Sequence, residues 1–309
     1  MRRSGTSSPR AAVAAALMAL AAAGCASIDQ VAEMVGAVGV ATGQMTEEEA
    51  QSVVRTAQAA AKAAEDITPE QEYYIGRAVA ATLLGRYRPL ERSELIEYVN
   101  LIGQALAMAS DRPETFGGYR FLVLDSDEIN AFAAPGGRIL VTSGMVRLCR
   151  TEDQLAAVLA HEIGHVQHRH GLQSIRQSRL TAALTVAAVE AGRHLGGAEL
   201  AEALSAFEGA IDDVTQTLVV NGYSRAAERE ADAAAVTILL RVGYEPRALI
   251  EMLEEMGRRL KPGGMDFART HPAPAERIRQ IRAAVEKAGP AASAPAARQR
   301  RFDRIVAAL

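Results

Sequence analysis

The chain has 309 residues, of which 49% are hydrophobic and 23% charged, enough for one substantial domain with appendages. Aromatic residues make up only 4% of the chain, and its abundant alanine favours helix over sheet. A net charge of −3 offers no basic surface of the kind that nucleic-acid binding requires, so we expect no nucleic-acid partner.

The N-terminus is typical of an exported bacterial lipoprotein. Three arginines accompany an apolar run at 11–23 that is too short to span a bilayer comfortably. The run ends in Leu-Ala-Ala-Ala-Gly-Cys, which resembles a lipobox with Cys25 as the lipidated residue. We therefore expect a signal peptide at 1–24 and a lipid anchor on Cys25. Because Ala26 rather than Asp follows, we also expect an outer-membrane location facing the periplasm. An ordinary cleavage site with an incidental cysteine is the alternative.

The other cysteine is Cys149, which lies in an apolar stretch without a nucleophile motif. We interpret it as a buried structural thiol. With Cys25 lipidated, no intramolecular disulfide can form, so packing or a metal must stabilise the fold.

The segments before the middle of the chain change from helical to strand-like patterns. Residues 25–67 are expected to form a tether and one N-terminal helix. Helices are predicted at 69–86 and 91–109 from their apolar spacing. Strands are predicted at 119–124 and 138–142, with a turn at 135–137 and a further extended segment at 130–134. The pattern indicates an α+β fold, mostly helical, with a small sheet of three or four strands and one exposed edge.

A helix beginning at Thr151 carries the motif His161-Glu162-Ile-Gly-His165. Two histidines four residues apart lie about 40° apart around a helix, so both imidazoles can reach one metal ion. Glu162 lies about 100° away, where a carboxylate can take a proton from metal-bound water. The motif predicts a zinc hydrolase, and the buried character of the helix argues against histidines that merely fill a core.

A hydrolytic zinc site needs a third protein ligand. His168 lies about 10 Å along the helix axis from His161, and His170 points to the opposite side of an unbroken helix. His194 has no supporting pattern. We predict Glu228 as the third ligand, with Asp232 accepting the remaining N–H of one histidine, because residues four apart share one helix face.

The rest of the chain is expected to be helical. Residues 174–220 are alanine-rich, and core packing, a lid, a membrane-facing element and a dimer surface all remain open for them. Helices are predicted at 225–242, 246–260 and 274–287. A linker and a basic amphipathic tail then occupy 288–309, and this tail could touch anionic lipid or dock on the parent domain.

Four motifs in order resemble one family. They are the His161–His165 motif, the segment Tyr223-Ser-Arg-Ala-Ala-Glu228-Arg-Glu-Ala-Asp232, the strand segment 130–145, and Thr270-His271-Pro272 with Arg277 six residues after the histidine. Together they resemble the zinc metallopeptidases of HtpX and the CaaX prenyl endopeptidases, which are gluzincins. The soluble periplasmic lipoprotein branch fits best, and the resemblance implies a metallopeptidase domain over 68–287.

The resemblance implies a mostly helical zincin-like fold whose edge strand borders the active-site cleft. One zinc ion per chain would be held by His161, His165 and Glu228, with Glu162 as general base. His271 and Arg277 would act at the cleft. The edge strand would pair with an extended substrate, and the substrate-binding residues implied there are Asn130, Ala131, Phe132, Gly136 and Gly137.

We therefore expect a zinc endopeptidase of the bacterial envelope that degrades misfolded or unassembled envelope and outer-membrane proteins. The first alternative is an envelope chaperone or assembly factor that binds extended chains at a mostly closed zinc site. The second is a lipoprotein that handles another metal or heme through His161, His165, His168 and His170.

Overall fold

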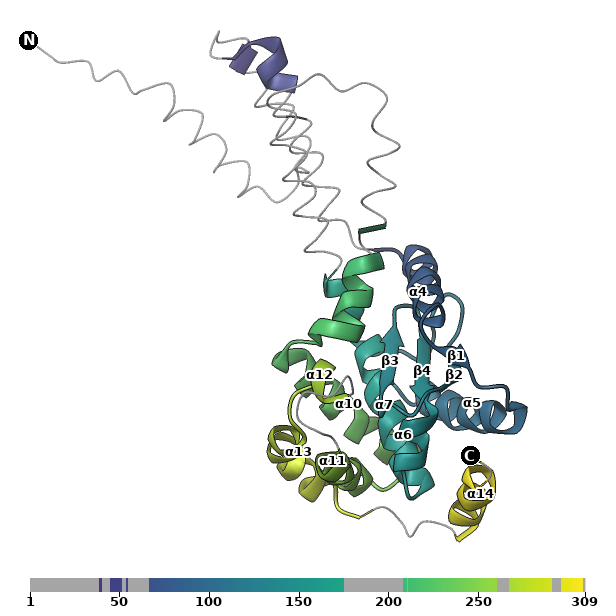
Figure 1. Ribbon diagram of the computed structural model, residues 1–309. Coiled ribbons are helices and arrows are strands. Elements are labelled where there is room, and N and C mark those ends of the chain that lie inside the picture. The colour runs from purple at the N-terminus through teal and green to yellow at the C-terminus, as the bar shows by residue number, and fades with distance from the viewer. Residues whose placement is uncertain are drawn as a thin grey trace, which may run out of the picture. The chain divides into compact units, whose positions relative to one another are not determined.

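The computed structural model describes residues 67–174, 211–259, 267–290 and 296–307, with short stretches at 39–40, 45–51, 54, 208–209 and 309. The fold described below is that of one compact unit, which comprises Ile67–Ile175 and Glu208–Leu309 (Figure 1). The expected signal peptide, the lipidated Cys25, His194 and most of the alanine-rich segment lie outside the described residues.

Within the described residues the unit consists of helices around one small sheet (Figure 1). The helices are α4 (Pro69–Leu84), α5 (Ser93–Met108), α6 (Ser143–Leu148), α7 (Glu152–Gln167), α10 (Arg225–Val242), α11 (Arg247–Arg259), α12 (Phe267–Thr270), α13 (Pro274–Ala288) and α14 (Ala296–Val306), with a π-helical turn η1 (Thr217–Asn221). The strands are β1 (Arg88–Pro89), β2 (Arg120–Asp125), β3 (Ala131–Ala134) and β4 (Arg138–Thr142). The prediction of a mostly helical α+β fold is confirmed.

The strands lie in the order β1-β2-β4-β3. The central strands β2 and β4 pair in parallel, with Phe121 opposite Ile139, whereas β1 and β3 are antiparallel to their neighbours. A tight turn joins β3 to β4 through Gly136 and Gly137, whose φ angles are 72° and 86°. Residues that carry a side chain rarely adopt such φ angles, so glycine is required at this turn. In this strand order, β3 lies at one edge of the sheet and contains part of the predicted substrate-binding segment.

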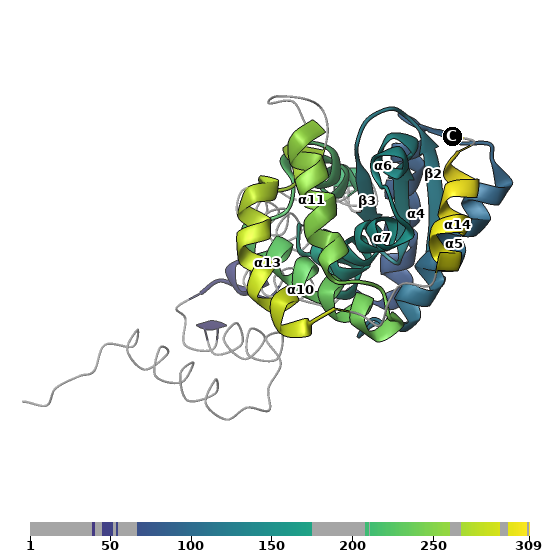
Figure 2. The ribbon, with the colours of Figure 1, turned by 90° about the horizontal axis from the view of Figure 1, so that it is seen from below.

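The two faces of the sheet bury alternate side chains, as a period of two requires. Phe121, Val123 and Ile139 pack with α5 and α7 in the larger core. Phe132 and Leu140 face the other way and pack with α4 in a second core. Figure 2 shows α10, α11 and α13 gathered on the side of α7 that faces away from the sheet. Helix α7 is thus enclosed between the sheet and three further helices.

The first turn of α7 is fixed by a buried carboxylate, Glu152. It accepts hydrogen bonds from the hydroxyl of Tyr98 at 2.7 Å, the hydroxyl of Tyr244 at 2.9 Å and Nε of Arg301 at 2.8 Å. These partners come from α5, from the turn after α10 and from α14. A buried charge needs such partners, and here they tie three elements to the start of the helix that carries the metal motif.

The C-terminal helix α14 packs on its own domain through its apolar face. Phe302 is buried in the larger core, and Ile305 and Val306 pack against it. Arg298 donates to Asp153 at 3.1 Å and lies over the ring of Tyr244. Of the two roles left open for the tail, the structure shows docking on the parent domain. The predicted domain boundaries themselves stay a prediction.

A second buried carboxylate, Glu72 in α4, joins the sheet turn to the end of α7. It accepts from the backbone N–H of Gly136 at 3.0 Å and pairs with two nitrogens of Arg112 at 2.8 and 2.9 Å. Arg169, directly after α7, lies 3.2 Å from the same carboxylate. The chain leaving α7 is thereby held in place. Among the described residues, no helix combines the length and apolarity needed to cross a membrane.

Replacing Arg301 by Ala should destabilise the fold by about 1–2 kcal/mol, less than for a fully buried pair because Arg301 is partly exposed. Burial acts to raise the pKa of Glu152, but Arg301 and the two tyrosines hold this pKa below its ordinary value. A lowered folded pKa stabilises the fold above the unfolded value of about 4.3, and this contribution is lost as pH falls.

Denaturant unfolding at pH 7 and at pH 3 measures the effect of the Arg301 substitution, with R300A, at an exposed position of the same helix, as the control. The difference between R301A and the wild type should shrink at pH 3. A difference equal at both pH values would show that the charge on Glu152 is not what α14 recognises.

Candidate metal centre

Helix α7 places the three residues of the metal motif in the interior. Thr151 caps the helix by accepting from the N–H of Gln154. His161, Glu162 and His165 are each about 1% exposed. The Nε2 atoms of the two histidines lie 3.1 Å apart, so both rings point at one spot. Helical spacing alone predicts this arrangement.

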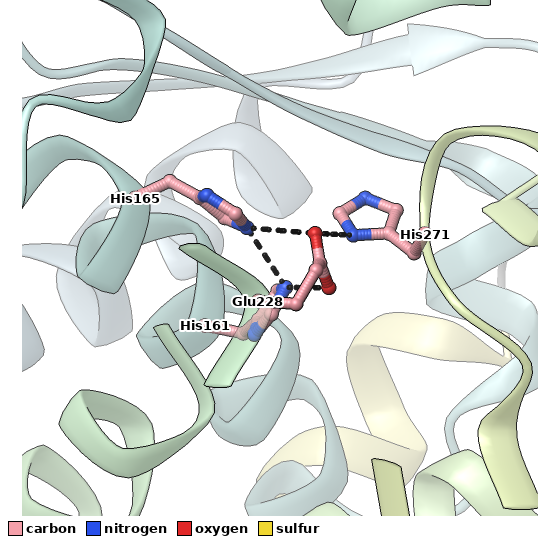
Figure 3. A group of neighbouring side chains, drawn as sticks. All are labelled: His161, His165, Glu228 and His271. Carbon is pink, nitrogen blue, oxygen red and sulfur yellow. Dashed lines mark hydrogen bonds and ion pairs between the residues drawn. The ribbon is translucent and has the colours of Figure 1, made fainter. Parts of the chain in front are cut away.

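Helix α10 brings Glu228 to the same spot (Figure 3). The side chain of Ser224 caps α10 at its start. The turn of α10 that contains Ala231 packs closely on α7. A Cβ atom on Gly164 would lie 2.8 Å from the carbonyl oxygen of Ala231, so a residue without a side chain is needed there. This close approach leaves Glu228 Oε1 at 3.4 Å from His165 Nε2 and Oε2 at 3.7 Å from His161 Nε2.

His271 completes the cluster from the loop after α12. Its Nδ1 lies 2.8 Å from Glu228 Oε1, and its ring stacks on Phe267 with the centroids 3.7 Å apart. The backbone N–H of Phe267 donates to Ile129 just before β3, which ties this loop to the sheet edge. Ligand atoms of His161, His165, Glu228 and His271 all lie within 4.8 Å of one another.

The cluster fits a zinc ion. Bonds of about 2.0–2.2 Å in a tetrahedral arrangement separate neighbouring ligand atoms by about 3.3 Å. The separations of 3.1, 3.4 and 3.7 Å among His161, His165 and Glu228 lie around this value. Glu228 Oε2 is buried without a hydrogen-bond donor from any part of the chain that the structure describes. A buried carboxylate oxygen left in this way is suited to a cation.

Glu162 lies beside this cluster and is not one of its four members. Its Oε1 is buried, and no described residue donates a hydrogen bond to it. Burial, together with the negative charge of Glu228, raises the pKa of Glu162 to about 8. A carboxylate with a free oxygen next to a metal ligand has the position of a general base.

Asp232 and Arg277 lie behind His161. Asp232 Oδ1 is 3.0 Å from His161 Nδ1, the contact that the sequence analysis expected for one of the histidines. Arg277 is fully buried and donates to both oxygens of Asp232, at 3.0 and 2.6 Å. Burial, with the positive charge of Arg277, lowers the pKa of His161 to about 3, which keeps the imidazole neutral as a metal ligand must be.

His165 is held by residues that the sequence analysis did not foresee. The prediction that His170 points to the opposite side was wrong, because it assumed an unbroken helix. Helix α7 ends at Gln167, and His170 Nδ1 comes to 2.9 Å from His165 Nδ1. Tyr223 stacks on the face of the His165 ring, with the ring centroids 4.1 Å apart. To predict the contact of His170 with His165, one would need a sequence signal that ends the helix shortly after the motif. The sequence contains no clear signal of this kind there.

The residues predicted to bind substrate lie along and around β3. Asn130 is buried, and its Oδ1 accepts from the N–H of Ala131. Phe132 packs into the core with α4, and Gly136 and Gly137 form the turn to β4. All four residues of β3 are buried, so the expectation of an exposed sheet edge was wrong for this strand. The side chains and the turn named above shape the strand, so a substrate contact there would be made by the strand backbone.

His168 and His170 supply none of the clustered ligand atoms. His168 stacks on His170, with their centroids 5.5 Å apart, and lies within 3.3 Å of Gln167. Cys149 is buried, as interpreted from the sequence, and burial raises the pKa of its thiol to about 12. An unreactive thiol and a compact His/Glu cluster favour the peptidase interpretation over the heme-handling one.

A model of peptidase family M48 matches residues 94–285, more than half of the chain. The chain belongs to peptidase family M48. The predicted membership in a zinc metallopeptidase family of the HtpX kind is thereby confirmed, and the cluster described above offers His and Glu side chains of the kind that hold zinc.

Relatives within and beyond bacteria carry the names of proteases. The beta-barrel assembly-enhancing protease of Escherichia coli (strain K12) is 29% identical over 69% of this chain. Metalloprotease LoiP of the same strain is 30% identical over 52% of the chain and 61% of its own length. The mitochondrial metalloendopeptidase OMA1 of Schizosaccharomyces pombe is 33% identical over 49% of the chain and 42% of its own length. The chain spans only 43% of the assembly-enhancing protease.

Replacing Asp232 by Asn should weaken zinc binding by about 10–100-fold, because His161, a predicted zinc ligand, loses its anionic partner. The same change leaves Arg277 buried without its charge partner and should destabilise the fold by about 3 kcal/mol or more. Zinc affinity from competition with a chelator and denaturant unfolding measure the two effects.

The matched control is the same change, Asp to Asn, at Asp212, which is exposed. Unchanged zinc affinity in D232N would show that His161 does not depend on this carboxylate.

Proposed function

We propose that this M48 chain is a zinc-dependent endopeptidase of the bacterial cell envelope. One observation carries the proposal. Glu162 keeps a buried oxygen without any donor among the described residues, next to a compact group of His161, His165 and Glu228. Three ligands and a neighbouring base are the composition of a hydrolytic zinc site.

Each residue of the site has a separate role in the proposed peptide hydrolysis. Zinc, when bound, acidifies a water molecule and polarises the carbonyl of the peptide. Glu162 takes the proton from the attacking water on Oε1 and delivers it to the leaving amine nitrogen. His271, whose Nδ1 lies 2.8 Å from Glu228 Oε1, would donate to the oxygen that gains charge. Arg277 is a positioning residue, since it holds Asp232 against His161 and its own Nη2 lies 3.1 Å from His161 Nδ1.

The substrate that we propose is an extended segment of a misfolded or unassembled envelope protein. Strand β3 is an edge of the sheet with one neighbour, β4, and a sheet edge can pair with an extended chain. The name of the beta-barrel assembly-enhancing protease supports a link to outer-membrane proteins. A lipid on Cys25 would hold the enzyme at the membrane, facing the periplasm.

An envelope chaperone or assembly factor is the second candidate. The position of His271 favours it, because His271 is buried and its Nδ1 already occupies Glu228 Oε1. A histidine in this position reduces access to the ligand group. Such a protein would bind extended chains at the same edge and would cleave them rarely.

Changing Glu162 to Gln should lower kcat on an unfolded protein substrate by about 10²–10⁴-fold, because the amide cannot accept the proton. Zinc content should stay at one ion per chain, since Glu162 is not in the ligand group. Substrate cleavage and metal analysis of the purified full chain measure both. E254Q, at an exposed position of α11, is the control.

Removal of zinc with a chelator should abolish cleavage by the wild type, and added zinc should restore it. Wild-type cleavage by the Glu162 variant would refute the assignment of the base. In cells, envelope proteins should accumulate in the variant. Full rescue of envelope function by E162Q would instead favour the chaperone candidate.

A further inference from the structure

The second zinc ligand of the proposed peptidase, His165, has two ring nitrogens in different surroundings. Its Nε2 faces the ligand group, 3.1 Å from His161 Nε2 and 3.4 Å from Glu228 Oε1. Its Nδ1 points away from the group and lies 2.9 Å from His170 Nδ1. The inference drawn from this contact rests on the proposed function, because it concerns the same zinc.

The chain path after α7 brings His170 to this position. The last residue of α7 is Gln167, and Arg169 adopts a left-handed conformation with φ of 56°. This conformation is uncommon for a residue with a side chain. It is held because Arg169 pairs with the buried carboxylate of Glu72 and donates to the carbonyl oxygen of Ile67. The turn folds back on α7, and His170 becomes 2% exposed.

The protons in this contact can be assigned by elimination. A histidine that binds a metal through Nε2 carries its proton on Nδ1. His165 must therefore donate, and His170 Nδ1 must accept. A neutral His170 then carries its own proton on Nε2, which lies 3.0 Å from the Glu230 carboxylate oxygen Oε2. Each donor in the series has an acceptor, and the series ends on a carboxylate.

We propose that His170 is a positioning residue for the zinc ligand His165, and that Glu230 fixes the tautomer of His170. His165 Nδ1–H donates to His170 Nδ1, and His170 Nε2–H donates to Glu230. The hydrogen bond sets the angle of the His165 ring and makes its Nε2 more basic toward the metal. Stacking of Tyr223 on the same ring, at 4.1 Å, restricts the remaining rotation.

The two zinc-binding histidines thus have different supports. His161 is backed by Asp232, a fully buried carboxylate that Arg277 also holds. His165 is backed by a buried imidazole whose far nitrogen reaches Glu230, a side chain that is 55% exposed. Because water can reach Glu230, the hydrogen bonds behind His165 extend to the protein surface, whereas those behind His161 end in the interior.

Substitutions that keep or remove the acceptor test the proposal. In H170N the amide Oδ1 takes the place of the imidazole Nδ1, so the acceptor for His165 is kept. In H170L a methyl group of similar size takes that place, and the acceptor is lost. H168L is the matched control, because His168 stacks on His170 without bonding His165.

Zinc affinity of the full chain is measured by competition with a chelator, without reference to proteolysis. We expect H170L to bind zinc about 10–100-fold more weakly than the wild type. H170N should lose well under tenfold, and H168L should match the wild type. Equal affinity of H170L and the wild type would overturn the proposal, and so would an H170N as weak as H170L.

Thermal unfolding in chelator separates positioning from a general structural effect. The apo forms of H170N and H170L should unfold at similar temperatures, with the difference between them appearing only when zinc is added. If H170L does not fold, E230A provides the test, because Glu230 is exposed. E230A should lose zinc affinity a few-fold, less than the 10–100-fold range, because water can replace the carboxylate. Unchanged affinity would overturn the role of Glu230.

The outcome separates this inference from the proposed function. A wild-type chain that binds no zinc would refute the zinc peptidase itself. A wild-type chain that binds zinc and cleaves protein, with H170L indistinguishable from it in affinity, would refute only the positioning role of His170.

Discussion

The close packing of α7 on α10 is the constraint on which the centre depends. Glu228, the proposed third ligand, lies 3.4 and 3.7 Å from the two imidazoles, and the missing side chain of Gly164 lets the backbone of Ala231 approach α7. Metal ligands must be held within a fraction of an ångström of their ideal positions. A methyl group at Gly164 would push the helices apart at the level of the ligands. Gly164 is thus as important for the distance between α7 and α10 as the two histidines are for holding a metal ion.

The buried charges of this helix pair explain why the site suits a divalent cation. Glu162, Glu228 and Asp232 face only one buried cation, Arg277, within this cluster. Three carboxylates and one guanidinium leave a formal charge of −2, which an interior of low polarity does not tolerate easily. Burial, and then the negative charge of Glu228, raises the pKa of Glu162, and protonation of Glu162 would remove one charge of the excess. A divalent cation beside these groups acts in the opposite direction and favours the ionised carboxylates.

Local spacing made much of the fold and the centre predictable from the sequence. Helices predicted at 69–86, 91–109, 225–242 and 274–287 end within two residues of α4, α5, α10 and α13. Strand β4 has the predicted bounds. The pairs His161/His165 and Glu228/Asp232 could be proposed from the sequence because residues four apart share a helix face. The small elements β1, α6, α12 and η1 were missed, since two to six residues are too few to show a period.

Contacts that depend on where a helix ends, or on distant parts of the chain, could not be predicted. His170 was assigned to the wrong side because nothing near Gln167 signals the end of α7. The docking of α14 depends on Glu152, far away in the sequence, which offers a buried carboxylate to Arg301. Periodicity describes one element at a time, whereas these contacts follow from how elements meet.

The acidic motif of α10 shows how far this limit extends. On an isolated helix, Glu228 and Asp232 share a face while Glu230 is turned about 200° away, toward solvent. Glu230 is indeed exposed, yet it bonds to His170 because the turn after α7 passes over that side of α10. On the proposed assignment, all three acids of the motif therefore serve one centre. Glu228 faces the ligand group, Asp232 supports His161, and Glu230 reaches His165 through an imidazole that only the folded chain brings near.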